Sequence, residues 1–308
     1  MDGGGIFLQR VTEKNRVYLC LLMVVFLWGV NSVSIKYLTQ FFPPVLLAAV
    51  RLVLASAFLF IFFFCTNKKR LLPRAAWAPT AGVSLFCIFL HQIALTTGLK
   101  ETSGTHAILI LGLGPLFTMI FAAVFLKEKI FLPQALGLLS GFLGVLLVVS
   151  GKSQSGSTLL GDGITAIAAI TFSIGSLFVK KAVCNSSSLA VTTYSHLFAA
   201  GGLATSAAFF YTGADFPADL GILPVLVLLF SSFMSTAVGA LLWNQSIHKA
   251  GASTASLFQN GSPVIGILAS AAFLGEELLW QYFISLVLVV GGVILGTGIW
   301  KMPLRTAK

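Results

Sequence analysis

Long apolar runs separated by short polar breaks fill most of this chain. A helix needs about 20 apolar residues to cross a bilayer, and the runs are close to that length. They cover residues 17–38, 44–65, 77–99, 104–126, 131–150, 160–183, 189–211, 222–247, 252–274 and 279–300. Membrane strands would instead show short alternating segments closed into a barrel. The pattern therefore predicts an all-α integral membrane protein with ten transmembrane helices.

The composition supports this interpretation and excludes two classes of protein. Hydrophobic residues make up 57% of the 308 residues and charged residues only 9%, and the mean hydropathy is +0.98. Soluble domains carry about 25% charged residues, and disordered chains are poor in hydrophobic residues. The polar residues 1–16 precede an apolar run that is too long for a cleavable signal, so we expect that run to be the first span.

The basic residues are distributed unevenly between the two sides of the predicted membrane. With the N-terminus in the cytoplasm, fifteen of the 19 Lys and Arg lie on the cytoplasmic side, three on the other side, and Arg51 lies within a span. This bias predicts that both termini are cytoplasmic, in a plasma membrane, or in the inner membrane if the protein is bacterial. The net charge of +10 then faces the bilayer surface, and no segment suits nucleic-acid binding.

The two halves of the chain resemble each other. A shift of 148 residues places Gly112–Pro115 on Asn260–Pro263, and Glu128 on Glu276. Each half contains five predicted spans, an odd number, so the second half is expected to be inverted relative to the first. We divide the chain into a cytoplasmic N-terminal segment 1–16, a first five-helix repeat 17–150, a linker 151–159, a second repeat 160–300 and a cytoplasmic tail 301–308.

Inverted repeats are typical of transporters, in which two halves move around a central site. A duplication without moving parts, as in a channel, is the alternative.

Several short motifs make a family resemblance specific. They are Trp28-Gly29-Val30-Asn31, Pro43-Pro44 followed by Arg51, Pro115 with Leu126-Lys127-Glu128, and Pro263 with Leu274-Gly275-Glu276. Together they resemble the EamA-type members of the drug/metabolite transporter superfamily, from about residue 17 to 300. The resemblance implies ten helices in two inverted repeats, and a central cavity lined by spans one, three, four, six, eight and nine. Phe172-Ser173 departs from the family's Trp-Gly pair in the second repeat.

Polar and amphipathic side chains at membrane depth usually face protein or a cavity. On this basis the expected substrate-binding residues are Trp28, Asn31, His91, Gln92, Tyr194, Trp243, Asn244, Gln259 and Asn260. Hydrogen bonding between helices is the alternative for the amides and for His91, and interfacial anchoring is the alternative for Tyr194 and Trp243. We expect Pro115 and Pro263, near the middle of their spans, to act as hinges, or else to form static bends.

Three further features carry expectations. We expect Arg51 to extend toward the headgroups, with pairing to a carbonyl or an anion as the alternative, and His106 to be solvated near the interface. The spacings Gly137-x-x-x-Gly141 and Gly292-x-x-x-Gly296 permit close helix packing, either within the chain or in a dimer. We therefore expect a monomer or a homodimer.

The nine acidic residues all lie outside the middle of the predicted spans. Transport coupled to a proton or sodium gradient often uses a buried carboxylate, so we expect exchange or facilitated diffusion instead. A cavity without acids disfavours strongly cationic cargo. Amide, hydroxyl and aromatic groups suit neutral or zwitterionic metabolites, and amino acids lead this class.

The sequence contains none of the motifs His-Glu-x-x-His, Gly-x-Ser-x-Gly or Gly-x-x-x-x-Gly-Lys-Ser/Thr. The four cysteines are far apart, with no Cys-x-x-Cys. We therefore expect no enzyme activity, catalytic residue, metal or cofactor.

The predicted function is a secondary transporter that exports small metabolites through a central cavity. The alternatives are a passive channel, a structural membrane protein, or a carrier of phosphorylated sugars or nucleotide-sugars. Such a sugar carrier would need several Lys or Arg at its site.

Overall fold

The computed structural model consists of helices joined by short turns, and the part of the chain that it describes contains no strand. The described residues are 3–66, 71–126, 132–149, 157–217, 219–250, 255, 258–259 and 261–297. Most of the expected linker 151–159, the tail 301–308 and Asn260 lie outside these residues. The predicted helical class is confirmed.

Within the described residues, five helical stretches are long and apolar enough to cross a membrane. They are Arg16–Leu38, Pro44–Thr66, Arg74–Glu101, Leu159–Asn185 and Ile222–Lys249. Shorter apolar helices include Gly104–Thr118, Ser262–Leu274 and Trp280–Gly292. Large apolar side chains such as Leu19, Phe209 and Val287 are exposed on the outside, which suits a surface that faces lipid.

In the first half, three predicted spans are continuous helices and two are composite. The continuous ones are α1 (Gly3–Leu38), α2 (Pro44–Thr66) and α7 (Leu132–Val149). The third span joins α3 (Arg74–Gly82), the π-helical segment η1 (Val83–Leu90) and α4 (His91–Glu101). The fourth is divided into α5 (Gly104–Leu111) and α6 (Gly114–Leu126).

The second half repeats this plan. The continuous helices are α8 (Leu159–Asn185), α9 (Ser188–Phe210) and α14 (Trp280–Thr297), with a short 3₁₀ turn η2 (Gly213–Asp215) after α9. The composite ones contain α10 (Ile222–Leu229), the π-helical segment η3 (Phe230–Val238), α11 (Gly239–Ala250) and α13 (Ser262–Leu274). A shift of 148 places η1 entirely within η3, so the two halves share an irregularity as well as a helix order.

Small polar residues define where several helices begin. The side chains of Ser103, Thr158 and Ser187 accept hydrogen bonds from the backbone N–H groups of His106, Gly161 and Ala190. Each bond satisfies an N–H at a helix start that has no partner within the helix. These caps explain why the polar breaks seen in the sequence separate the helices.

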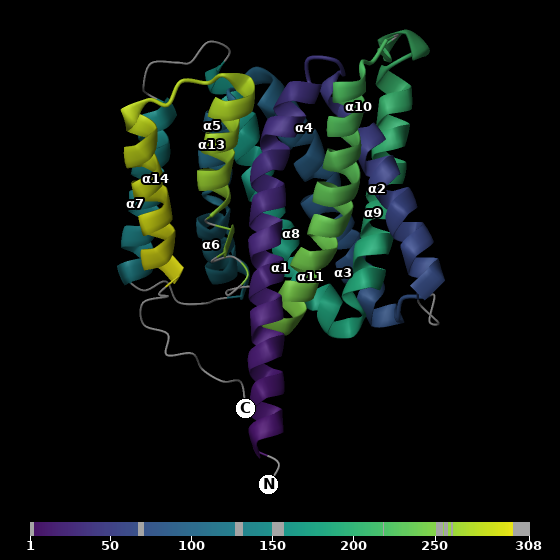
Figure 1. Cartoon of the computed structure of the whole chain (residues 1–308), viewed down its shortest axis with the longest axis vertical. Helices are drawn as coiled ribbons and strands as arrows, with labels where there is room; N and C mark the ends of the chain where they lie inside the picture. Colours follow the sequence, from purple (N-terminus) through teal and green to yellow (C-terminus); the bar gives the residue numbers. More distant parts are fainter. Residues whose placement is uncertain are drawn as a thin grey trace.

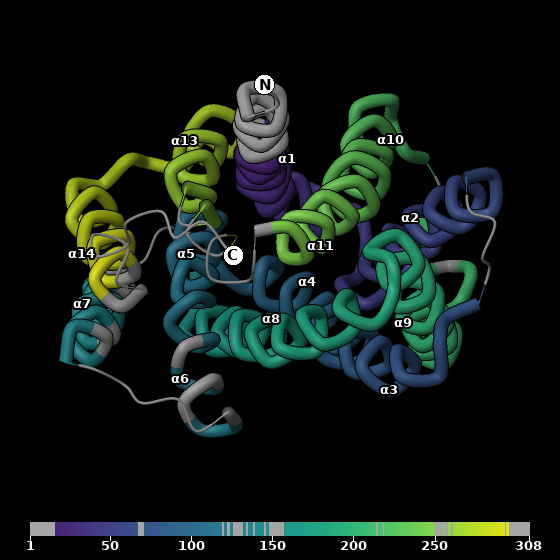
Figure 2. The backbone as a smooth tube through the Cα atoms, turned by 90° about the horizontal axis from the view of Figure 1, so that it is seen from below, coloured from purple at the N-terminus to yellow at the C-terminus, as the bar shows by residue number. Residues whose placement is uncertain are grey.

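The two halves interlock at the centre of the bundle. Helix α1 packs on α11 and α13 of the second half, and α8 packs on α4 and α6 of the first. These are equivalent contacts under the repeat. Figure 1 shows that α1 begins and α14 ends at the same end of the bundle, and Figure 2 shows α1 and α8 facing each other across its middle. The space between α1 and α8 is therefore shared by both halves.

Helices α7 and α14 form a closely packed pair at one edge (Figure 2). A Cβ atom on Gly292 would lie 2.5 Å from the carbonyl oxygen of Gly137. Ser140 and Ser285 donate hydrogen bonds across the pair, to the carbonyl oxygens of Leu288 and Gly144. Small residues therefore bring these two backbones together within the chain, as the Gly-x-x-x-Gly spacing permits.

Candidate functional site

A pocket of about 150 Å³ lies at the centre of the bundle, and both halves line it. We call it the central pocket. The first half contributes residues of α1, η1, α4, α5 and α6, and the second half contributes residues of α8, η3, α11 and α13. These elements belong to the six spans that the resemblance implies, and His196 of α9 adds a seventh.

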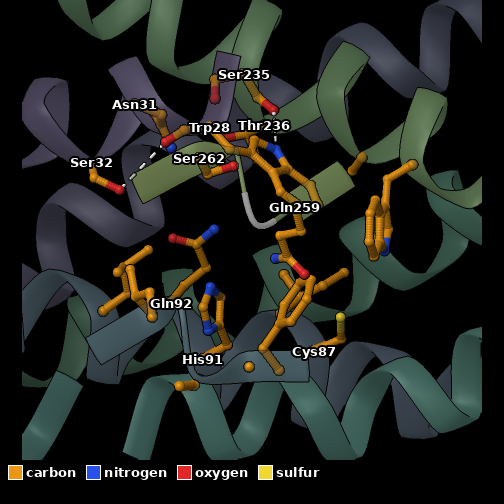
Figure 3. Close-up of a pocket in the computed structure, with 18 of the residues that line it drawn as sticks. Trp28, Asn31, Ser32, Cys87, His91, Gln92, Ser235, Thr236, Gln259 and Ser262 are labelled. Atoms are coloured by element: carbon orange, nitrogen blue, oxygen red, sulfur yellow. Dashed lines mark hydrogen bonds between the residues drawn. The ribbon is translucent and has the colours of Figure 1, made fainter. Parts of the chain in front are cut away.

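Most of the residues expected to bind substrate line the central pocket. They are Trp28, Asn31, His91, Gln92, Trp243, Asn244 and Gln259. Figure 3 labels five of them, Trp28, Asn31, His91, Gln92 and Gln259. Tyr194 is not among the lining residues. Its ring lies 5.4 Å from Trp77 and 5.9 Å from Phe63, measured between ring centroids. Tyr194 thus belongs to an aromatic cluster between α2, α3 and α9. Asn260 is not among the described residues.

Three aromatic rings form one side of the central pocket, which we call the aromatic wall (Trp28, Phe172 and Trp243). The ring centroids of Trp28 lie 5.7 Å from Phe172 and 5.2 Å from Trp243. Trp28 donates its indole N–H to the carbonyl oxygen of Ser235, at 3.2 Å. Phe172 was not among the residues expected to bind substrate, although it follows Trp28 by 144 residues, the same separation as between the similar segments Ser32–Lys36 and Ser176–Lys180. In the second repeat, where the family has a Trp-Gly pair, this chain therefore places another aromatic ring, that of Phe172, at the same pocket.

His91 is held in one orientation at the edge of the aromatic wall. Its Nδ1 lies 2.9 Å from the carbonyl oxygen of Ala168, so Nδ1 must carry the proton that it donates. In the neutral ring, Nε2 is then a hydrogen-bond acceptor. The ring packs 5.2 Å from Phe172.

A polar network beside the central pocket corrects the expectation for Arg51. Its side chain is 1% exposed rather than extended toward the headgroups. It donates to Ser231 at 2.6 Å, Thr236 at 2.9 Å, Gln92 at 3.1 Å and Asn31 at 3.5 Å. Because these acceptors come from α1, α4 and η3, Arg51 joins both halves directly behind the pocket.

The two π-helical segments position this network. Segment η1 ends directly before His91 and Gln92, and η3 carries Ser231, Ser235 and Thr236. Wide π turns are frequent at functional sites. The apolar periodicity of the sequence does not reveal them, and the cluster of Ser and Thr within 231–236 is the only signal that could have drawn attention to η3.

The proline positions coincide with breaks in the helical pattern near the pocket. Helix α5 ends at Leu111, a turn covers Gly112 and Leu113, and Pro115 lies in the first turn of α6. Pro263 lies in the first turn of α13 and lines the pocket. Proline suits a first turn because the helix requires no N–H there. The regular helix of the fourth span is therefore interrupted at Gly112 and Leu113, directly before Pro115, and the role of Pro115 and Pro263 as hinges stays a prediction.

A second polar cluster lies at the end of the bundle where α13 ends and α5 begins (Figure 1). Glu276 accepts hydrogen bonds from the backbone N–H groups of Gly104 and Thr105, at 2.6 and 2.9 Å, and from the Thr105 hydroxyl. A carboxylate at a helix N-terminus is favoured by the helix dipole. This contact ties the second half to the first on one side of the pocket.

His106 belongs to the same end of the bundle and corrects another expectation. It is 2% exposed rather than solvated, and its Nδ1 lies 3.2 Å from Asp162. Thr102 donates its hydroxyl to the other carboxylate oxygen of Asp162, at 2.5 Å. A buried carboxylate from α8 thus holds both residues that flank the start of α5.

Known proteins that resemble this chain are transporters. The model of the EamA-like transporter family matches twice, over residues 15–150 and 159–297. The transporter YyaM of Bacillus subtilis (strain 168) is 31% identical over 302 residues, which cover 95% of this chain and 97% of YyaM. A protein of Salmonella typhimurium named "Probable amino-acid metabolite efflux pump" is 28% identical, with coverage of 93% and 96%. An Escherichia coli (strain K12) protein of the same name is 26% identical, with coverage of 88% and 91%.

A solved crystal structure shares the fold. Its TM-score is 0.68 over 92% of this chain and 97% of the other, at 19% identity. The double match of the family model, one copy on each half, agrees with the repeated helix order and with the pocket between the halves. This chain belongs to the EamA-like transporter family.

Proposed function

We propose that this protein is a secondary transporter, not an enzyme, that exports small neutral or zwitterionic metabolites such as amino acids. The observation that carries the proposal is the central pocket, which lies between two equivalent halves and is lined by both. The names of the Salmonella and Escherichia coli relatives, which describe amino-acid metabolite efflux, support the cargo class and the direction.

The size and chemistry of the central pocket support a small cargo. Its volume of about 150 Å³ is below the roughly 300–1,000 Å³ of pockets for drug-sized ligands. The aromatic wall offers apolar contact, and Asn31, Gln92, His91 and Gln259 offer hydrogen bonds. No acidic side chain lines the pocket among the described residues, which argues against strongly cationic cargo and against coupling through a membrane carboxylate.

The repeated architecture supports alternating access by ten spans in two inverted halves. The helix break before Pro115 and the start of α13 at Pro263 border the pocket, where rotation of one half against the other would bend the backbone. With both termini in the cytoplasm, as the basic residues predict, the Glu276 contact lies on the outer side of the membrane. Release of that contact would then open the pocket outward.

Counterflow in proteoliposomes tests the proposal. Liposomes that contain the purified full-length chain are loaded with a pool of unlabelled amino acids, and labelled amino acids are supplied outside. We expect saturable, trans-stimulated uptake that falls roughly tenfold at low substrate in Gln92→Ala, because one hydrogen bond is lost and an Arg51 donor is left unpaired. Gln245→Ala, at an exposed position on α11, is the matched control.

Two results would contradict the proposal. Flux that rises linearly with concentration, without trans-stimulation, would indicate a channel. Equal flux through the parent, Gln92→Ala and Gln245→Ala would remove the central pocket as the transport site.

A further inference from the structure

Arg51 is a buried cation beside the central pocket, and no described side chain neutralises its charge. All four of its hydrogen-bond acceptors are neutral, and it forms no ion pair within the described ranges. The guanidinium group remains protonated in proteins. A positive charge has therefore been removed from water with only dipoles to compensate it, which is costly in free energy.

The hydrogen bonds of Arg51 decide which way two pocket amides face. A guanidinium only donates, so it contacts Oε1 of Gln92 and Oδ1 of Asn31. The Ser231 hydroxyl also donates to Oδ1 of Asn31, at 2.6 Å. The –NH₂ groups of both amides are thus left for the pocket, and neither has an acceptor within the described residues.

We call this side of the pocket the amide wall (Asn31 and Gln92). Figure 3 shows both side chains on the same side of the pocket, with His91 next to Gln92. The amide wall presents hydrogen-bond donors to the pocket, with the charge of Arg51 directly behind them. Such a surface favours a group that is negatively charged and rich in acceptors.

We infer that the amide wall binds a carboxylate group of the cargo, with Arg51 supplying the balancing positive charge. The inference rests on the proposed function and narrows its cargo class to metabolites that carry a carboxylate. One carboxylate has one negative charge, which matches the single guanidinium, and its two oxygens accept hydrogen bonds from two amides. A phosphate monoester carries about 1.5 to 2 negative charges at pH 7 and would leave part of its charge uncompensated. An ammonium group has only hydrogen-bond donors, and the amide wall also presents donors, so the two cannot form a hydrogen bond.

Thermal stabilisation of the purified full-length protein tests the inference without requiring transport. The probes are leucine and phenylalanine, the carboxylates 4-methylpentanoate and 3-phenylpropionate, and the amines 3-methylbutylamine and 2-phenylethylamine. Each carboxylate lacks only the ammonium group of its amino acid, and each amine lacks only the carboxylate. We expect half-saturation for the carboxylate-bearing probes at concentrations roughly tenfold or more below those for the amines, as a charge-assisted hydrogen bond implies.

Two variants identify the residues responsible. Arg51→Gln removes the charge, and Asn31→Asp places a carboxylate next to Arg51 with little change of shape. We expect both to abolish the preference for carboxylates. Asn31→Asp keeps the test valid if Arg51→Gln does not fold. Arg74→Gln and Asn185→Asp, both at exposed positions, are the matched controls and should keep the preference.

The inference is overturned if the amines stabilise the parent as well as the carboxylates do, if no carboxylate-bearing probe stabilises it, or if Asn31→Asp keeps the preference. Counterflow separates these failures from failure of the proposed function. Trans-stimulated exchange without a carboxylate preference leaves a transporter with a different cargo contact, whereas absence of any saturable exchange removes the transporter itself.

Discussion

Single polar residues inside this bundle satisfy one another across large distances in sequence. Asn31, Arg51 and Ser231 form one hydrogen-bonded group from three helices. His106, Thr102 and Asp162 form another, at the end of the bundle. Because buried polar groups are costly when they are left unpaired, each group fixes the relative positions of the helices that it joins.

Replacement of Asp162 by alanine should destabilise the protein. The hydroxyl of Thr102 and the ring of His106 would both lose their partner in a buried environment, at a cost of about 1–3 kcal/mol. We expect a lower melting temperature for Asp162→Ala in detergent, measured by intrinsic fluorescence. Asp219→Ala, at an exposed position, should melt like the parent. Equal melting of both variants would show that the Asp162 group does not stabilise the bundle.

The sequence predicted some of these residues better than others, for a physical reason. Asn31, His91 and Gln92 stand out because polar side chains within apolar spans are rare. The buried position of Arg51 depends on hydrogen bonds to Ser231 and Thr236, which lie 180 and 185 residues away in the sequence. The sequence shows only that Arg51 lies near one end of its predicted span, and this position favoured a side chain that extends to the headgroups. Tyr194 resembles the lining residues in polarity, but it packs against Phe63 and Trp77 and does not line the pocket.

At the scale of helices, the apolar runs predicted where the helices lie but not how regular they are. Runs of Leu, Val and Phe are equally apolar in an α-helix and in a π-helix, so η1 and η3 left no mark in the hydrophobic pattern. The break before Pro115 was better predicted, because proline removes a helix hydrogen bond in any context. Local irregularity is therefore visible in the sequence only where the residue type itself forces it.

Gly175 of α8 allows η1 to lie directly against that helix. A Cβ atom there would lie 2.5 Å from the backbone nitrogen of Cys87 and would also meet the Cβ of Cys87. Overpacking of this kind costs about 1–3 kcal/mol, and the strain falls on the segment that positions His91 and Gln92. We therefore expect Gly175→Ala to lower both the melting temperature and the rate of counterflow.

Gly163→Ala on the same helix is the control for this prediction. Its added Cβ atom would meet nothing within 4 Å, and alanine favours a helix over glycine by roughly 0.5–1 kcal/mol. The variant should be at least as stable as the parent. If Gly175→Ala behaved in the same way, the close approach of α8 to η1 would not be required.

For the whole molecule, the repeat explains why the pocket is central. Equivalent contacts of α1 and α8 close around a shared space, and the α7–α14 pair joins the halves away from it. The sequence predicted the repeat from Pro115, Pro263 and the two glutamates that follow them. Which equivalent side chains would meet was not predictable, because that depends on how the halves are placed against each other.

The α7–α14 pair should contribute to the thermal stability of the protein without affecting its selectivity among substrates. Gly292→Ala would press a methyl group against the backbone of Gly137 and Gly141, whereas Gly291→Ala would meet nothing within 4 Å. In proteoliposomes heated stepwise before assay, we expect Gly292→Ala to lose counterflow at a lower temperature than Gly291→Ala and the parent. An unchanged order of preference among amino acids would confirm that the pair lies outside the site, and equal heat resistance of the two variants would contradict its structural importance.

The equivalent π-helical segments η1 and η3 also bear on how the two repeats of this chain arose. A π turn accommodates one residue more than an α turn, so each segment corresponds to a one-residue insertion in a regular helix. Such insertions occupy equivalent places in both halves, at 83–90 and 230–238. The simplest history has a single insertion in an ancestral five-helix unit, which was copied when the gene was duplicated. The π turn is then older than the two-repeat chain. It was already present at the interface when two separate copies of that five-helix unit associated with each other.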